Sequence, residues 1–193
     1  MGFVKRIWAY LARTQPVPIR VLHLMVILLV VSQLITSNLV RLDQVGYGAA
    51  FSWGTWAHIL PGLTLAAIMT IFVLVELFCR GLKDFYPYLW GNLAQLKSDV
   101  KQLARLKLPA AEPGGLPAVV QGLGLVLLCL TLLSGLAWYL LVQSNAGTAH
   151  AAVAVHEALT GLVVVYVIGH GGMGLLHMLL WLRSTKSVTT DAA

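Results

Sequence analysis

The chain has 193 residues, of which 59% are hydrophobic and only 10% are charged, and its mean hydropathy is +0.83. Because a soluble domain usually carries about a quarter charged residues, this composition predicts a membrane protein. The net charge of +6 does not indicate nucleic-acid binding, since the basic residues flank apolar segments and form no stripe interleaved with aromatic side chains. Cys79 and Cys129 form no CxxC or CxxCH motif, which removes support for zinc fingers, a disulfide framework and covalently attached haem.

Four apolar segments are long enough to cross a bilayer, which takes roughly 20 residues of helix. The first is too long for a cleaved signal peptide, and we interpret it as an uncleaved anchor. The fourth is longer than a bilayer requires, which indicates tilt or an extension beyond the membrane. We therefore expect one all-α membrane domain over residues 1–193, a four-helix bundle with spans at about 19–40, 56–79, 118–142 and 151–182.

The basic residues predict the orientation of these spans. Twelve of the thirteen lie on one side of the predicted membrane, and only Arg41 lies in a loop on the other side. By the positive-inside rule both termini are then cytoplasmic. The twelve are Lys5, Arg6, Arg13, Arg20, Arg80, Lys83, Lys97, Lys101, Arg105, Lys107, Arg183 and Lys186.

The longest connection, residues 81–117, is then cytoplasmic. Apolar residues recur in it at intervals of three and four from Leu89 to Leu106, with Lys97, Asp99 and Lys101 elsewhere on the helical wheel. This pattern predicts an amphipathic helix on the membrane surface.

Histidines within the spans are the candidate functional residues. His156 and His170 are fourteen residues apart in the fourth span, so on a helix they face the same way, about 21 Å apart along its axis. His177 follows two turns later on nearly the same face. The first span carries His23 and the second carries His58.

Depth in the membrane predicts which histidines meet. His58 and His156 both begin spans that enter from outside, so they lie near the outer face. His23 lies near the inner face, where its partner is His170 or His177. Two facing imidazoles at one level make an axial pair for an iron porphyrin, so two levels predict two haems. A lone membrane histidine is otherwise often a hydrogen-bonding residue between helices.

Other residues near these histidines have weaker assignments. Arg20 lies one turn before His23 and suits a haem propionate, although an arginine at the inner end of a span more often anchors topology. Glycines beside His58 and His170 would let a helix or a flat ring approach the backbone. His150 is interpreted as an exposed loop residue. Glu76 is interpreted as an acidic residue whose side chain reaches the interface, with a proton-relay group as the alternative.

Three motifs resemble the bacterial cytochrome b561 family, which is related to the b-type subunits of nickel–iron hydrogenase and formate dehydrogenase. They are RVLH (Arg20–His23), HILPG (His58–Gly62) and HEALTGLVVVYVIGH (His156–His170) followed by His177. The resemblance covers essentially the whole chain, although Leu24 stands where many relatives have tryptophan. It implies a four-helix bundle with two b haems, the outer one held by His58 and His156 and the inner one by His23 and His170.

The resemblance also implies a function. Family members pass electrons between membrane quinone and a partner on one side of the membrane; some oxidise superoxide, and others are membrane subunits of dehydrogenases. The chain has no glycine-rich nucleotide loop or iron–sulfur cysteine cluster, so we expect an external partner at the outer haem and quinone at the inner one, with Arg20 and His177 as candidate quinone contacts. The alternatives are a haem-free four-helix transporter or proton relay, and a structural membrane anchor of a dehydrogenase.

Overall fold

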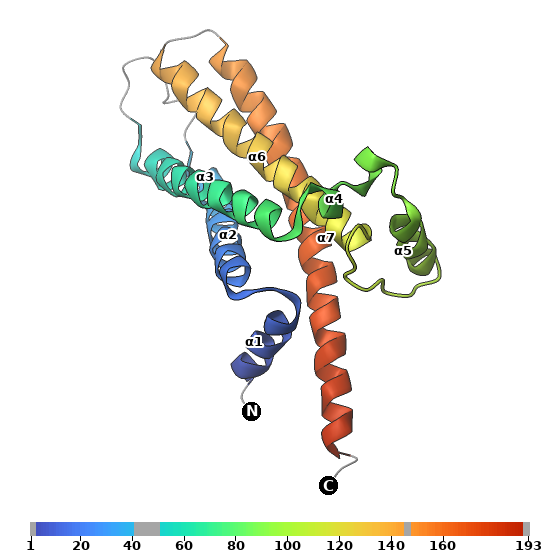
Figure 1. The fold of residues 1–193 in the computed structure, drawn as a ribbon. Helices are drawn as coiled ribbons and strands as arrows, with labels where there is room; N and C mark the ends of the chain where they lie inside the picture. Colours follow the sequence, from blue (N-terminus) through green and yellow to red (C-terminus); the bar gives the residue numbers. More distant parts are fainter. Residues whose placement is uncertain (1–2, 41–50, 145–147, 191–193) are drawn as a thin grey trace. The chain divides into compact units, whose positions relative to one another are not determined.

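The computed structural model describes residues 3–40, 51–144 and 148–190, and within these ranges the chain is helical with no strand (Figure 1). The predicted all-α fold class is therefore confirmed. The α-helices in chain order are α1 (Phe3–Thr14), α2 (Val17–Thr36), α3 (Trp53–Arg80), α4 (Leu82–Phe85), α5 (Ala94–Ala104), α6 (Leu116–Gln143) and α7 (Ala149–Thr190).

Four of the described helices are long and apolar enough to cross a membrane. Their apolar stretches are 17–39, 53–80, 116–143 and 149–184, each within three residues of the predicted bounds. Large apolar side chains on them are exposed, Leu28 at 70% and Phe78 at 91%, as expected where lipid rather than protein covers the surface. The orientation of the termini stays a prediction; Arg41 and the side chain of Lys186 lie outside the described residues.

The chain folds into two compact units. The first comprises residues 1–20, 80–124 and 164–193, and the second comprises residues 21–79 and 125–163. In the second unit α2, α3, the later part of α6 and the early part of α7 enclose a small apolar core. Its buried side chains are Val26, Val30, Ile59, Leu65, Met69, Phe72, Leu125 and Val163.

The first unit contains a helix that the sequence analysis did not predict. α1 packs against the end of α7, where the rings of Tyr10 and Trp181 lie 5.5 Å apart and Nη2 of Arg6 donates to the Leu182 carbonyl at 2.8 Å. α1 ends at Thr14, because Pro16 disfavours helical backbone in the residue before it. Burial also raises the pKa of the Tyr10 hydroxyl.

In the connection between α3 and α6, two aspartates accept hydrogen bonds from backbone N–H groups at or just before the start of α6. Asp84 accepts a hydrogen bond from Gly114 N at 2.7 Å, and Asp99 accepts one from Leu116 N at 2.8 Å. Backbone N–H groups at the start of a helix lack intrahelical acceptors, so the Asp99 carboxylate satisfies a donor that α6 leaves open at Leu116. Asp84 holds the backbone of the connection two residues before the helix.

The amphipathic helix in this connection is shorter than predicted. The expected range was Leu89–Leu106, whereas Leu89 lies in a 3-10 helix (Pro87–Trp90) and α5 covers only Ala94–Ala104. Gly91 ends the 3-10 helix with a φ of +72°, a left-handed conformation that glycine adopts easily and that interrupts helical hydrogen bonding. The regular apolar spacing in the sequence therefore continues through a position where the helix is interrupted.

Candidate functional site

His58 on α3 and His156 on α7 meet inside the second unit. Their ring centroids lie 6.4 Å apart, and the ring planes are inclined at 81°. Both side chains belong to apolar helices in which a bare imidazole would be costly. The predicted meeting of His58 with His156 is therefore present, and the groups around each ring decide what the pair can do.

One nitrogen of the His156 ring is held by α6. Nδ1 lies 3.0 Å from the carbonyl oxygen of Thr131 and 3.0 Å from the hydroxyl oxygen of Ser134, which itself donates to that carbonyl at 2.7 Å. A carbonyl oxygen can only accept, so Nδ1 carries the hydrogen. The lone pair of Nε2 is then left for a metal.

The His58 ring is held in the same way by α2. Its Nδ1 lies 3.2 Å from the hydroxyl oxygen of Thr36, which donates its own hydrogen to the Ser32 carbonyl at 2.8 Å. The hydroxyl oxygen therefore accepts from Nδ1–H, and Nε2 keeps its lone pair. Gln33 also donates to the His58 carbonyl at 3.0 Å, which ties α2 to α3 beside the ring.

A glycine on α6 gives His156 its place. A Cβ at Gly135 would lie 2.9 Å from Cε1 and 3.2 Å from Nδ1 of the His156 ring, closer than ordinary contacts allow. Gly135 is also four residues after Thr131, so its missing side chain leaves the Thr131 carbonyl open on that side. The glycine thus lets the ring reach its hydrogen-bond acceptor.

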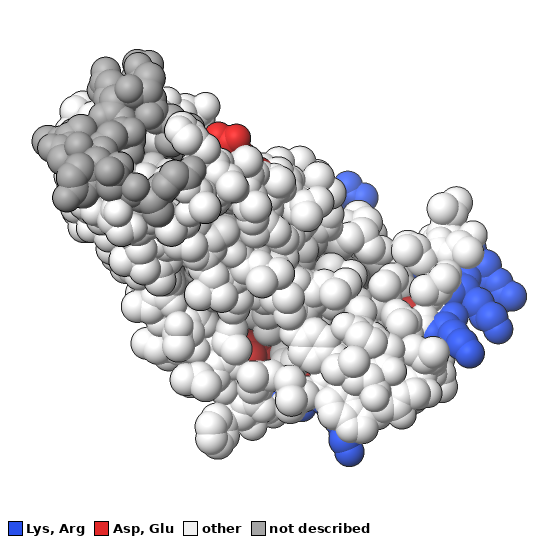
Figure 2. Space-filling view, turned by 90° about the horizontal axis from the view of Figure 1, so that it is seen from above, with Lys and Arg blue, Asp and Glu red and all other residues white. Residues whose placement is uncertain are grey.

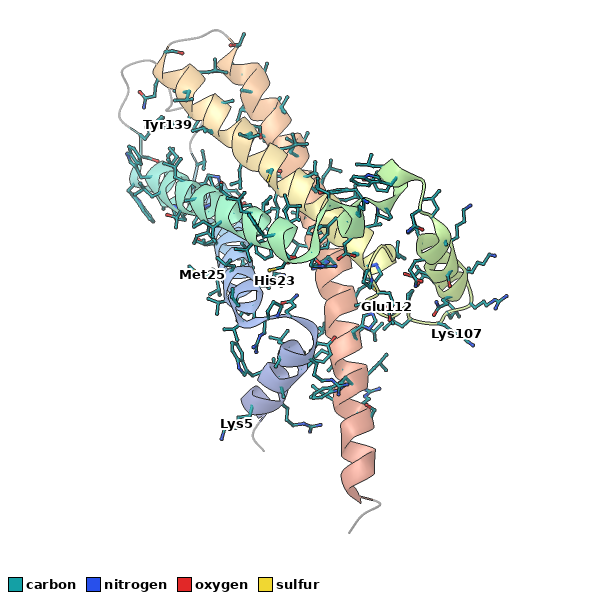
Figure 3. The ribbon with its side chains drawn as sticks, in the orientation of Figure 1. Lys5, His23, Met25, Lys107, Glu112 and Tyr139 are labelled. Atoms are coloured by element: carbon teal, nitrogen blue, oxygen red, sulfur yellow. The ribbon has the colours of Figure 1, made fainter. Side chains whose placement is uncertain are left out.

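Both histidines line a cavity of about 450 Å³ that lies within the second unit. This volume is within the range of small-molecule and cofactor sites, which are mostly apolar with a few placed polar groups. Tyr139, labelled in Figure 3, is one of its lining residues. The polar or ionisable residues among the described lining are Gln33, Ser37, His58, Thr131, Tyr139, His156, Glu157 and Thr160.

The other predicted ligands do not form a pair that the structure places. His23, labelled on α2 in Figure 3, stacks on Phe72 with centroids 5.9 Å apart and planes at 13°. His170 stacks on Tyr166 with centroids 5.1 Å apart and planes at 14°. His23 belongs to the second unit and His170 to the first, so their pairing stays a prediction.

Arg20 is buried, with 6% of its surface exposed, and its guanidinium lies 4.6 Å from the ring centroid of Trp8 on α1. Its Nε and Nη1 atoms are buried and have no hydrogen-bond partner among the described residues. Such a cation is costly unless it meets an acceptor. Arg20 therefore presents donors suited to an anionic or carbonyl group.

The remaining candidates differ in their surroundings. His177 is half-buried. His150 is exposed, as predicted, but it lies in the first turn of α7 and not in a loop, so that part of its interpretation was wrong. Glu76 is fully buried at 0% exposure on α3, so the interpretation that its side chain reaches the interface was wrong. It lies one helical turn after Phe72, whose ring stacks on His23.

Comparison with known families identifies the chain. The family model of prokaryotic cytochrome b561 matches residues 14–190. The chain belongs to the prokaryotic cytochrome b561 family. It is therefore a multi-pass membrane cytochrome of the b type that takes part in electron transfer, and cytochromes of this family bind haem b. Neither the curated proteins nor the solved structures contain a match to the chain.

The His58–His156 pair fits a haem of this cytochrome b561. A metal bonds to an imidazole nitrogen at about 2 Å, and that nitrogen lies about 1 Å from the ring centre, so two imidazoles on opposite sides of one metal have centres about 6 Å apart. The observed separation is 6.4 Å. Among the described residues no group of three or more His, Cys, Asp or Glu could hold a bare metal ion, whereas an iron porphyrin would need only the two imidazoles from the chain.

Sequence reasoning missed the residues that support these rings. Three of them form hydrogen bonds to the rings, and the fourth leaves room for one of the rings: Thr36, Thr131, Ser134 and Gly135. The sequence analysis assigned no site residue to the third span. The run TLLSG (Thr131–Gly135) in α6 was a usable signal, because hydroxyl and small residues in an apolar span often mark a close interhelical contact. Tyr166 was also missed; its ring occupies the position that a Cβ at Gly124 would take.

Gly135→Ala is expected to push the His156 ring away from the Thr131 carbonyl and to lower haem b content per chain, by up to about half if one of two haems is lost. Pyridine haemochrome absorbance relative to protein concentration measures this. Gly161→Ala is the matched control, because its Cβ would meet no atom within 4 Å beyond the nearby backbone of its own helix, and Gly161 does not line the cavity. Equal haem content in both variants would contradict the role assigned to Gly135.

Proposed function

We propose that this cytochrome b561 holds two b haems and carries electrons across a bacterial inner membrane, with both termini in the cytoplasm. The outer haem would lie between His58 and His156 and exchange electrons with superoxide, another outer-side donor or a partner redox protein such as a dehydrogenase subunit. The inner haem would exchange electrons with membrane quinone. The His58–His156 pair, with its two Nδ1 hydrogens engaged elsewhere, carries this proposal.

Haem bound at this pair would supply one-electron oxidation and reduction at iron. The chain's own residues perform the other tasks. Thr36 and the Thr131–Ser134 pair fix the tautomer and direction of the two imidazoles, so that both Nε2 atoms would be free to hold the haem iron. The lining of the cavity is mostly apolar, which suits the low-dielectric surroundings that a buried redox centre would need.

His23 and His170 are proposed as the inner ligands, on the family spacing of fourteen residues between His156 and His170. Each ring stacks on an aromatic side chain, which restricts its rotation. Arg20 lies three residues before His23, and its buried donors suit either a haem propionate or a quinone carbonyl. His177 is the second proposed quinone contact, since its imidazole can donate to or accept from such a carbonyl.

Replacement of His156 by alanine is expected to remove the outer haem and spare the inner one, so haem content per chain falls by about half. The purified protein's reduced-minus-oxidised spectrum and haemochrome assay measure this. The exposed His150 provides the control, and His150→Ala should retain both haems. Full haem content in His156→Ala would show that His156 is not a ligand, and a haem-free wild-type protein made with ample haem would end the proposal.

For the inner site, His170→Ala is expected to lose one haem while His177→Ala loses none. The two variants remove the same ring from the same helix seven residues apart, so the comparison separates ligation from general damage to α7. Redox titration monitored by absorbance should show one midpoint missing in His170→Ala alone. The reverse result would make His177 the partner of His23.

A quinone analogue is expected to shift the absorbance or midpoint potential of the haem that His170→Ala removes. In Arg20→Gln its half-saturating concentration should rise about tenfold or more, because the loss of one charged hydrogen-bond donor costs about 1.5–3 kcal/mol. Arg13→Gln is the control: this arginine also lies over a tryptophan ring, but it is exposed. A shift confined to the haem that His156→Ala removes would place quinone on the outer side.

A further inference from the structure

α5 directs its polar side toward the protein. Gln95 donates to one carboxylate oxygen of Asp99 at 2.9 Å, and Leu116 N donates to the other at 2.8 Å. Asp99 is fully buried at 0% exposure although it carries an ionisable group. A surface helix of a water-soluble domain buries its apolar side instead, so the arrangement in α5 is inverted.

The apolar side chains of this segment are correspondingly exposed. At about 100° per residue, Leu96, Val100 and Leu103 share a sector next to the one that contains Asp99. Val100 is 51% exposed and Leu103 is 42% exposed. The preceding 3-10 helix adds Tyr88, Leu89 and Trp90, which are 40%, 66% and 49% exposed.

The end of α5 presents another leucine outward. Leu106 N donates to the Leu103 carbonyl and Lys107 N to the Gln102 carbonyl, both at 2.9 Å, which is the hydrogen-bond pattern of a Schellman motif. Glycine usually occupies the left-handed position of that motif, but here Leu106 has a φ of +55°. Its side chain is 96% exposed. A large apolar side chain is therefore exposed at a position where the backbone conformation favours glycine.

Cationic side chains flank the apolar sector of α5 on the side away from Asp99. Lys97, Lys101 and Arg105 recur every four residues and are exposed, as is Lys107 just beyond the helix end. Figure 2 shows Lys and Arg gathered in this part of the surface, and Figure 3 labels Lys107. Asp99 is the one acidic residue in the range 94–107, and it is buried, so every exposed charge of this segment is positive.

We propose that α5 and the 3-10 helix before it form a docking surface for anionic phospholipid. The exposed leucine, valine and tryptophan side chains would enter the boundary between headgroups and acyl chains, while the four cations contact headgroup phosphates. The occupant follows from charge complementarity and from the tether: α3 ends at Arg80 and α6 begins at Leu116, and both are spanning helices. The segment is thus attached at each end to the bilayer surface that it would contact.

Spin labels on the full-length protein test this surface. In a Cys79→Ala, Cys129→Ala background, a label at Leu103→Cys reports on the apolar sector and one at Ser98→Cys on the opposite side of α5. The protein is placed in nanodiscs of phosphatidylcholine alone or of phosphatidylcholine with phosphatidylglycerol. Collision rates with oxygen, which concentrates in lipid, and with a water-soluble nickel chelate measure the depth of each label; haem absorbance checks that each variant is folded.

In anionic nanodiscs the ratio of oxygen to nickel collisions at position 103 should exceed that at position 98 at least threefold. The triple variant Lys97→Gln, Lys101→Gln, Arg105→Gln should remove the additional depth that phosphatidylglycerol produces. A label at 103 as accessible to nickel as the label at 98 in both lipid mixtures would overturn the proposal. So would protection from both collision partners that grows with protein concentration, because it would identify a protein partner, and equal depth in both mixtures, because it would remove the lipid charge from the interaction.

Discussion

The hydrogen bond from Nδ1 of His156 to the carbonyl of Thr131 is the interaction on which the candidate site depends. It decides which nitrogen of the ring carries hydrogen, it sets the ring's direction, and it links α7 to α6. The bond is possible because Gly135 leaves that carbonyl uncovered and Ser134 occupies the same acceptor without blocking it. A side chain of one carbon at position 135 would compete for the space of the imidazole.

A similar hydrogen bond holds the other histidine of the second unit. The Thr36 hydroxyl accepts a hydrogen bond from Nδ1 of His58, as Ser134 and the Thr131 carbonyl do from Nδ1 of His156. Both rings therefore have the same tautomer, which groups on two different helices determine. In an apolar segment such polar groups have few alternatives, since neither water nor lipid can satisfy them cheaply. The hydrogen bonds therefore hold α2 to α3 and α6 to α7 beside the two rings.

The sequence predicted the spans well, because an apolar run of bilayer length has one simple solution, a helix whose backbone bonds are internal. The meeting of His58 with His156 followed from their depth alone. The supporting groups did not, since a threonine or glycine in an apolar helix is common and its role depends on which side chain faces it. α1 was missed because its basic residues interrupt the apolar spacing of the sequence. The range of α5 was wrong because the apolar spacing continues past Gly91, where the helical backbone is interrupted. Asp99 had been placed with the lysines, whereas it is buried against the start of α6.

The hydrogen-bond acceptors of the two proposed ligands would affect the midpoint potential of a haem bound between them. Many metal-binding histidines donate to a carboxylate, which adds negative character to the imidazole and makes it a stronger donor to the metal. Here both Nδ1 groups donate to neutral oxygens, the Thr36 hydroxyl on one side and the Ser134 hydroxyl with the Thr131 carbonyl on the other. Neutral acceptors stabilise ferric iron less than an anionic one does, so a haem held by this pair would have a higher midpoint potential than one held by histidines that donate to carboxylates.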